Sequence, residues 1–424
     1  MLEKLTQIFK IRDLRKSILY VLGLLVIFRI AAHIPIPGVN LENLKEFFAS
    51  NQIFGLINIF SGGGMNNFSV VALGVGPYIT ASIILQLLVM IIPRLEELSK
   101  EPGGQQKINH WTRLLTVPLA ALQGYGTISV LSRQSTYKII TFLSSFDLIL
   151  TLITLTAGTI FLMWIGELIS ERKIGNGISL IIFAGIIDRL PGMIQRTLVV
   201  FDPAQIFNLV LFAIIAVITI VGVVIINEGM RNVPVSYARH VRGNKMYGGV
   251  STHLPLRVNM AGVIPIIFAI SLIIFPPMIA SFFVHAKSQI LVNVAQFIIS
   301  VFQNQLIYGI LYFVFVFGFT YFYTAVIFHP QQIAENLQKQ GGFIPGIRPG
   351  KHTEDYLAHV TNRIIFAGAL FLGLIAILPL LIQQFTGGLN LVIGGTSLLI
   401  VVSVVIETVK QVESQLTMRE YEGL

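Results

Sequence analysis

Ten long apolar stretches alternate with polar segments along the 424 residues of the chain. A stretch of about 20 apolar residues is what an α-helix needs to cross the hydrocarbon core of a bilayer, which is roughly 30 Å thick. The pattern therefore predicts ten membrane-spanning helices, at residues 17–36, 68–92, 113–132, 147–169, 174–194, 207–227, 258–284, 305–328, 364–383 and 389–409. The fifth is the weakest, because Asp188, Arg189 and Pro191 interrupt it.

One further apolar segment is too short to cross. The sequence "IFGLINIF" at residues 53–60 would extend about 12 Å as a helix, and three glycines follow, Gly62, Gly63 and Gly64. The pattern alone leaves two interpretations open. The segment is either a helix that rests on the membrane surface, or a movable cover on a flexible tether.

Composition and charge agree with a membrane protein. Hydrophobic residues make up 54% of the chain and charged residues only 12%, more apolar surface than a soluble fold can bury. Cysteine is absent, which excludes disulfides and thiol chemistry. Of the 29 Lys and Arg residues, 22 fall on the two termini and the loops on the same side, counting Arg113 at the start of its span, and six on the opposite loops, counting Arg189 near the end of its span. This bias predicts that both termini lie in the cytoplasm.

The ten spans divide into two sets of five, residues 1–195 and 196–424. A five-span half has inverted topology relative to its copy, as in many transporters, although the halves share no convincing sequence identity. Two cytoplasmic loops are long and basic, 228–257 and 329–363. The N-terminal stretch 1–16 is amphipathic, and it is either a helix along the cytoplasmic interface or a frayed tail. The outer loop 281–305 is also amphipathic.

Sequence motifs typical of catalytic, nucleotide-binding or metal-binding sites are missing. The chain has no phosphate-binding loop, no HExxH and no Cys/His metal spacing, and "IGNGIS" at 174–179 is better explained as a sharp entry into the fifth span. Ionisable residues are scarce at mid-membrane. Arg29 is near the outer end of span one, where it can snorkel to the headgroups, and Glu167, Glu171 and Glu407 are near cytoplasmic ends. A neutral conduit fits this pattern better than an ion-coupled transporter.

Several motifs resemble one family, the SecY family of channel subunits of the bacterial protein translocase. They are "FSVVALGVGPYITASIILQLL" (68–88), "MWIGELISERKIGNGISLIIFAGI" (163–186), "STHLPLRVNMAGVIPIIFA" (251–269), "QQIAENLQKQGGFIPGIRPGKHTEDYL" (331–357) and "GGTSLLIVVSVVIETVKQVESQL" (394–416). The resemblance implies an all-α polytopic fold in which two inverted five-helix halves surround an hourglass pore. It also implies a location in the bacterial cytoplasmic membrane and a channel for unfolded preproteins, with no enzymatic activity and no cofactor.

The resemblance assigns roles along the pore. It implies a plug helix at about 53–64, with the apolar residues Ile53, Phe54, Leu56, Ile57, Ile59 and Phe60 and the hinge glycines Gly62, Gly63 and Gly64. It implies a pore ring of six isoleucines, Ile79, Ile83, Ile178, Ile182, Ile267 and Ile400. At 1.5 Å per residue, Ile79, Ile267 and Ile400 come out near mid-membrane. Ile178 and Ile182 do so only if the fifth span begins below the surface.

The same resemblance places partners on the cytoplasmic loops. The SecA ATPase or the ribosome would dock on basic residues, namely Arg231, Arg239, Arg242, Lys245 and Arg348. Membrane topology alone also accounts for scattered basic residues, whereas Arg348 stands between a glycine turn and Pro349, which favours a contact role. The other implied partners are SecE, SecG, signal peptides, preproteins and anionic lipids, with no nucleic acid other than ribosomal RNA.

A lateral gate between spans two and three on one side and seven and eight on the other is implied as the exit for signal sequences. Gln86 and Asn259 are candidates for hydrogen bonds across it, with packing or hydration as the alternative. Pro265, Pro276 and Pro277 are expected to bend or soften span seven. Two other classes stay open from the residues alone, an ion-coupled transporter and a scaffold or insertase without a continuous pore.

Overall fold

A computed structural model describes residues 11–50, 63–132, 139, 144–199, 206–237, 239–242, 245–248, 251–284, 287–386 and 395–422. The chain forms two compact units. The first comprises Met1–Val210, Ile270–Tyr308 and Val404–Leu424, and the second comprises Leu211–Ala269 and Gly309–Ser403. The division into halves 1–195 and 196–424 stays a prediction.

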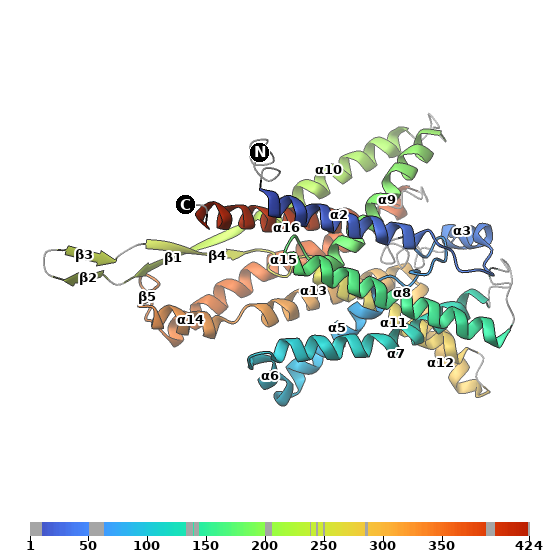
Figure 1. The fold of residues 1–424 in the computed structure, drawn as a ribbon, viewed down its shortest axis with the longest axis horizontal. Coiled ribbons are helices and arrows are strands. Elements are labelled where there is room, and N and C mark those ends of the chain that lie inside the picture. The colour runs from blue at the N-terminus through green and yellow to red at the C-terminus, as the bar shows by residue number, and fades with distance from the viewer. Residues whose placement is uncertain are drawn as a thin grey trace. The chain divides into compact units, whose positions relative to one another are not determined.

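Helices dominate both units (Figure 1). Those in or mainly in the first unit are α2 (Arg12–Ala32), α3 (Leu41–Ser50), α5 (Gly76–Ile91), α6 (Pro93–Lys100), α7 (Gly104–Ser132), α8 (Ser145–Glu171), α9 (Gly177–Val199), α11 (Ile264–Phe283) and α12 (Gln289–Gln303). Those mainly in the second unit are α10 (Ile206–Glu228), α13 (Gln305–Ile327), α14 (Pro330–Lys339) and α15 (Lys351–Thr386). The last helix, α16 (Gly395–Glu422), begins in the second unit and ends in the first.

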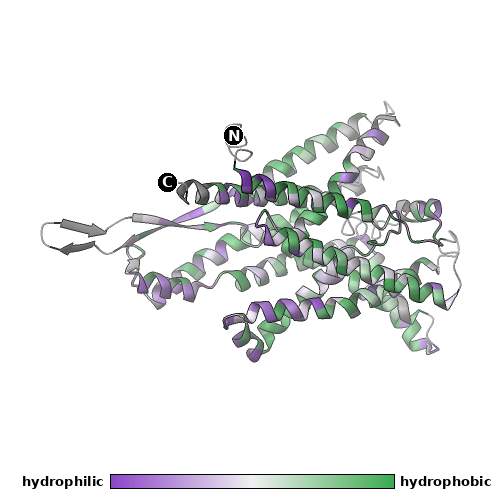
Figure 2. Cartoon of the chain, in the orientation of Figure 1, coloured by the Kyte–Doolittle hydropathy of each residue, from purple (hydrophilic) through white to green (hydrophobic). Residues whose placement is uncertain are grey.

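A helix occupies each of the ten predicted apolar stretches. Within the described residues, three helical stretches are long and apolar enough to cross a membrane: Ser145–Glu171, with a mean hydropathy of 2.2, and Gln305–Lys339 and Lys351–Leu378, each with 2.0. A fourth is added if α5 and α6, which meet at a bend of 103°, count as one span. Figure 2 shows that residues coloured as hydrophobic predominate along α5, α8, α13 and α15, whereas α6 and α14 are largely hydrophilic. The crossing of the membrane by all ten helices stays a prediction.

The first unit is built on α5, α7 and α8, which pack in sequence, with α9 against α8 and α2 against both α8 and α9. Glycines allow the closest approaches. A Cβ atom on Gly158 of α8 would overlap the carbonyl oxygen of Val70. The segment before α5 therefore lies directly on α8 at a point where only glycine fits.

The second unit contains strands that the all-α prediction missed. β1 (Met230–Tyr237) pairs antiparallel with β4 (Ser251–Arg257) and with the short β5 (Gly342–Phe343), in the order β4-β1-β5. A second pair, β2 (Arg239–Arg242) and β3 (Lys245–Gly248), continues the ribbon (Figure 1). The two predicted loops 228–257 and 329–363 thus contain ordered elements.

The three-stranded sheet β4-β1-β5 belongs to one packed body. The buried residues of its core come from β1, β4, the segment after β5 and α15, and they are Val233, Val235, Leu256, Ile344, Leu357 and Val360. Helix α14 adds Ile333 and Leu337 at its edge. We call this body the loop module. The two loops are therefore joined through a shared hydrophobic core.

Candidate functional site

The turn between α8 and α9 sets the start of the helix that carries Ile178 and Ile182. The side-chain oxygen of Asn176 accepts hydrogen bonds from the backbone N–H of Ile178 at 3.0 Å and of Ser179 at 3.2 Å. Asn176 thus caps the helix N-terminus, which confirms the sharp helix entry predicted at "IGNGIS". A Cβ atom on Gly177 would overlap the backbone of Gly166, so α9 starts in direct backbone contact with α8.

Other parts of the first unit hold this turn. The guanidinium of Arg172 lies 4.3 Å from the centre of the Tyr20 ring of α2. The side-chain amide of Gln415, in α16, donates to the carbonyl oxygen of Lys173 at 2.6 Å. Lys173 has a φ of 56°, an uncommon value for a residue other than glycine. The start of α9 is therefore supported from α2, α8 and α16.

Four of the six predicted ring residues lie in the first unit. Ile79 and Ile83 are each 4% exposed and stand four residues apart in α5, and so share one face of that helix. Ile182 is fully buried and Ile178 is half-buried, with the same spacing in α9.

The other two predicted ring residues lie in the second unit. Ile267, near the start of α11, is 4% exposed, and Ile400, near the start of α16, is 1% exposed. The neighbouring Phe268 makes edge-on contacts with Phe319 and Tyr323 of α13, with ring centres 6.0 and 5.8 Å apart. α13 therefore braces the first turns of α11. The closing of the six isoleucines into one ring stays a prediction.

The predicted plug lies outside the described residues. This applies to Ile53, Phe54, Leu56, Ile57, Ile59, Phe60 and Gly62. Gly63 and Gly64 are described, and they lie in a hydrogen-bonded turn. The carbonyl oxygen of Gly63 accepts from the N–H of Asn66 at 3.3 Å, and that of Gly64 accepts from the N–H of Ser69 at 2.9 Å. Gly63 has a φ of 85°, which favours glycine. Two of the three expected hinge glycines are thus part of an ordered turn.

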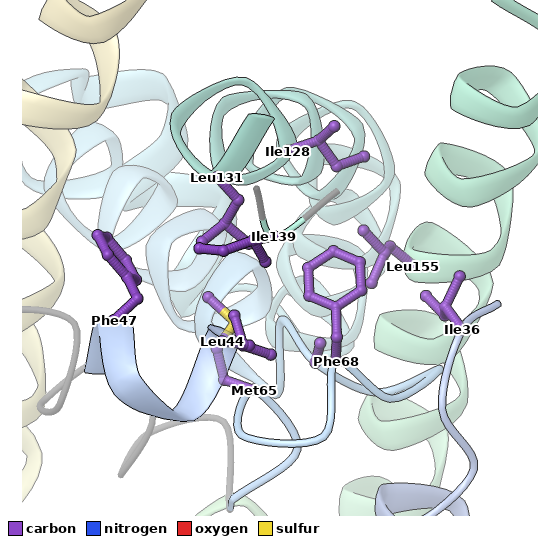
Figure 3. Packing of buried hydrophobic residues seen from close by; sticks show 10 residues of the cluster. Ile36, Leu44, Phe47, Met65, Phe68, Ile128, Leu131, Ile139 and Leu155 are labelled. Carbon is purple, nitrogen blue, oxygen red and sulfur yellow. The ribbon is translucent and has the colours of Figure 1, made fainter. Parts of the chain in front are cut away.

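Both ends of the segment 51–62 enter one hydrophobic cluster, which we call the anchor cluster. Its buried members are Ile36, Leu44, Phe47, Met65, Phe68, Ala72, Ile128, Leu131, Ile139 and Leu155. Figure 3 shows Leu44, Met65 and Phe68 turned toward side chains of α7 and α8. Leu44 and Phe47, in α3, precede the segment, and Met65 and Phe68 follow it. The two ends are therefore held together.

Backbone contacts reinforce the anchor cluster. The N–H of Ile36 donates to the carbonyl oxygen of Phe68 at 2.9 Å, and the N–H of Val70 donates to that of Ile34 at 3.0 Å. Phe68 has a φ of 40° and is fully buried. A strained conformation at a bulky residue persists only where the surrounding packing enforces it.

The predicted gate residues bond within their own units. The side-chain amide of Gln86 donates to Ser82 one turn earlier, at 3.0 Å. That of Asn259 donates to Asn227 of α10, at 2.7 Å. The remaining oxygens, Gln86 Oε1 and Asn259 Oδ1, are buried without a hydrogen-bond partner among the described residues.

The expectation for Pro265 needs a correction. Pro265 is the second residue of α11, whereas Pro276 and Pro277 stand inside the helix. A proline in the first turn removes no intrahelical hydrogen bond and does not kink the helix. Any softening of α11 therefore falls on Pro276 and Pro277.

The basic docking candidates lie on and around the loop module. Arg231, in β1, and Arg348 are exposed. Arg348 stands between Gly346 and Gly350, whose φ values are 83° and 93°, and its carbonyl oxygen accepts a hydrogen bond from Thr353 at 2.9 Å. This geometry agrees with the predicted loop tip. Arg239, Arg242 and Lys245 are placed in the β2–β3 hairpin, and their side chains lie outside the described part.

Two charged pairs were missed from the sequence, because their partners are far apart along the chain. Arg29 of α2 forms an ion pair with Asp188 of α9, where snorkelling to the headgroups had been expected. Arg113 of α7 pairs with Glu167 of α8 at 2.6 Å. Charged side chains of predicted spans are thus paired inside the first unit, as the cost of exposing a charge to lipid requires.

Comparison with known proteins identifies the family. The SecY family model matches residues 69–409. This chain belongs to the SecY family. The protein translocase subunit SecY of Mycobacterium tuberculosis is 45% identical to it, over 97% of both chains. SecY proteins are channel subunits of the protein translocase rather than catalytic enzymes, and this membrane protein has their function, the translocation of proteins through a channel.

Solved structures show the same fold. A structure titled "The structure of a protein conducting channel" matches 93% of this chain and 91% of its own, with a TM-score of 0.64 and 19% identity. Another, whose title states that the plug domain of SecY stabilises the closed state of the channel, matches with the same coverage, a TM-score of 0.62 and 20% identity. The helical channel fold expected from the sequence is therefore confirmed.

Proposed function

We propose that polypeptides pass between two inverted five-span halves, through a neutral constriction formed by Ile79, Ile83, Ile178, Ile182, Ile267 and Ile400. Five of these side chains are less than 5% exposed, and each pair on α5 and α9 shares a helix face. A narrow apolar passage resists ions because it offers no substitute for their water. Branched aliphatic side chains can still yield around a peptide of any sequence.

The segment 53–60 is the plug of this passage. The observation that carries this proposal is the anchor cluster, because it holds the residues before and after the segment in one place. The twelve residues 51–62 could then leave the pore and return to it as a loop with fixed ends. Because Gly63 and Gly64 are held in a turn, the pivot lies before Gly63. Seating a few apolar side chains would stabilise the closed state by a few kcal/mol, at about 1.5–3 kcal/mol each before entropy losses.

The lateral gate uses Gln86 and Asn259 as implied by the family, and the softening of α11 first expected at Pro265 falls on Pro276 and Pro277. Among the described residues, the buried oxygens of Gln86 and Asn259 have no hydrogen-bond partner, which supports this assignment. A buried acceptor without a donor destabilises the structure by about 1–3 kcal/mol. A donor from a moving gate helix or an arriving signal peptide would recover that energy.

The loop module is the docking surface for the motor. Arg348 at its tip and Arg231 on β1 are exposed, and Arg239, Arg242 and Lys245 belong to the hairpin beside it. SecA or the ribosome, including its RNA, would bind here, while SecE and SecG pack against the spans. Anionic lipids would also meet this basic side, which lies in the cytoplasm with both termini.

The test is the resting ion conductance of the reconstituted translocase. A charged residue at Ile57 or Ile59 should raise the leak by unseating the plug, and Ile400→Asn should raise it by hydrating the ring. The matched control is Ile153→Asn, because Ile153 of α8 is 61% exposed. If all three variants stay as tight as the wild type, the plug-and-ring mechanism is wrong for this protein.

Topology is tested separately. The chain has no cysteine, so a single cysteine at position 240 or 348 can be labelled without background. Both positions should react with an impermeant reagent only from the cytoplasmic side. Labelling from the outside alone would overturn the ten-span topology and the docking assignment together.

A further inference from the structure

Helix α12, Gln289–Gln303, has three chemically different faces. One is polar and exposed, and consists of Gln289, Asn293, Gln296 and Ser300. The next is apolar and exposed, and consists of Ile290 (76%), Leu291 (45%), Val294 (50%) and Phe297 (68%). The third packs on protein, with Ala295 only 2% exposed and Val292 and Ile299 half-buried.

These faces are sectors of one helical wheel. At about 100° per residue, the four polar residues fall within roughly 60° of one another, and the four exposed apolar residues occupy the adjoining sector of about 120°. The protein-packed residues fill the side that remains. Water, an apolar medium and protein would therefore each meet a separate side of α12.

Two features identify lipid as the apolar medium. At 1.5 Å per residue, the helix is about 22 Å long, too short to cross a bilayer, yet along the chain it follows the apolar helix α11 and precedes the apolar helix α13 of a membrane channel. Within its bounds it has no charged residue, so the contact is not an ionic one with an acidic or basic partner. Large apolar side chains exposed beside a polar stripe are typical of interfacial helices.

We propose that α12 lies flat in the membrane interface, with Ile290, Leu291, Val294 and Phe297 in the upper acyl region and the polar stripe in water. An apolar face of this kind enters about 5–10 Å into the boundary between headgroups and acyl chains. The outer end of α11 is thereby anchored to the bilayer surface. The proposal depends on the membrane location of the family and not on the plug or the pore ring.

The experiment is a cysteine scan of α12 in the complete translocase, reconstituted in phosphatidylcholine and phosphatidylglycerol vesicles. Single cysteines replace Ile290, Val294 and Phe297 on the apolar face, and Asn293 and Gln296 on the polar stripe. Each is labelled with an environment-sensitive fluorophore. The apolar positions should emit at shorter wavelength and be quenched by lipids brominated near the top of their chains. The polar positions should be quenched by aqueous iodide.

Two results would overturn the proposal. Quenching of the apolar positions by iodide would place that face in water. Protection of the same positions from both quenchers would show that protein covers it. A label at Ile153 of α8, which is 61% exposed on a predicted span, is the control for bromine quenching. The resting complex is used throughout, so failure of the plug-and-ring mechanism would leave this result unaffected.

Discussion

Phe47 is the residue at which the anchor cluster is most directly tested. Its side chain is 1% exposed and lies four residues before the segment 51–62. Truncation of a buried phenylalanine to alanine costs about 3–5 kcal/mol. The proposed seating of the plug is worth a few kcal/mol, so Phe47→Ala would remove a free energy of about the size of that seal. If about 3 kcal/mol of this lost stability came from the closed state of the plug, the population of channels with an open plug would rise on the order of 100-fold.

The assay is the resting ion conductance of the reconstituted translocase, with hydrogen exchange of the amides of α3. Phe47→Ala should raise the leak and speed exchange across Leu41–Ser50, because both report loss of the same anchor. The matched control is Phe146→Ala. Phe146 is 71% exposed at the start of α8, so the same deletion there creates no cavity.

The reasoning has a clear point of failure. Faster exchange in α3 with an unchanged leak would mean that the anchor cluster does not hold the plug. Unchanged exchange and unchanged leak would mean that Phe47 is not buried as described. An equal leak in Phe146→Ala would trace the effect to loss of any aromatic side chain and not to the anchor.

Three further predictions concern other parts of the molecule. Arg348→Glu should slow motor-driven translocation, while the amount of protein is unchanged and its free energy of unfolding stays within about 0.5 kcal/mol of wild type. Unchanged transport would mean that Arg348 serves only membrane topology. Gly158→Ala should destabilise the complex by roughly 1–3 kcal/mol, measured by thermal unfolding, because the added methyl group overlaps the carbonyl of Val70. Arg113→Glu should cost up to about 1 kcal/mol, since this pair is partly exposed, and the swap Arg113→Glu/Glu167→Arg should recover it.

Local patterns in the sequence predicted the helices well, because the bilayer requires long apolar runs that are readable one at a time. The cap at Asn176 and the tip at Arg348 were also predictable, since glycine and asparagine mark such turns by their own conformational preferences. The charge bias predicts a membrane topology as well, and that topology stays a prediction.

The strands of the loop module were missed, although a signal was present. Val233, Val235 and Tyr237 alternate with polar residues, the period of a half-buried strand. Pro234 in the middle of that run argued against a strand, since proline donates no ladder hydrogen bond. Within the part of the chain that the structure describes, β5 pairs only with Ser236 and Tyr237, so Pro234 is paired on one side only, with His253 of β4.

The anchor cluster and the paired charges were beyond the reach of pattern reading. Arg29 and Asp188 are each unusual in a span, but nothing local indicates that they meet. The ordered turn at Gly63 and Gly64 was also not predicted, for a related reason. Three consecutive glycines are typical of a flexible tether, whereas hydrogen bonds to Asn66 and Ser69 place two of them in a turn.

The span of sequence enclosed by the anchor cluster bears on the biosynthesis of the channel. Its members run from Ile36 to Leu155, so the cluster cannot close until α8 has left the ribosome. Contacts between distant residues form late, because the intervening chain must first be made and brought together. Until then the two ends of the proposed plug segment 51–62 are not held together. The proposed seal therefore cannot form before α8, the fourth predicted span, has been synthesised.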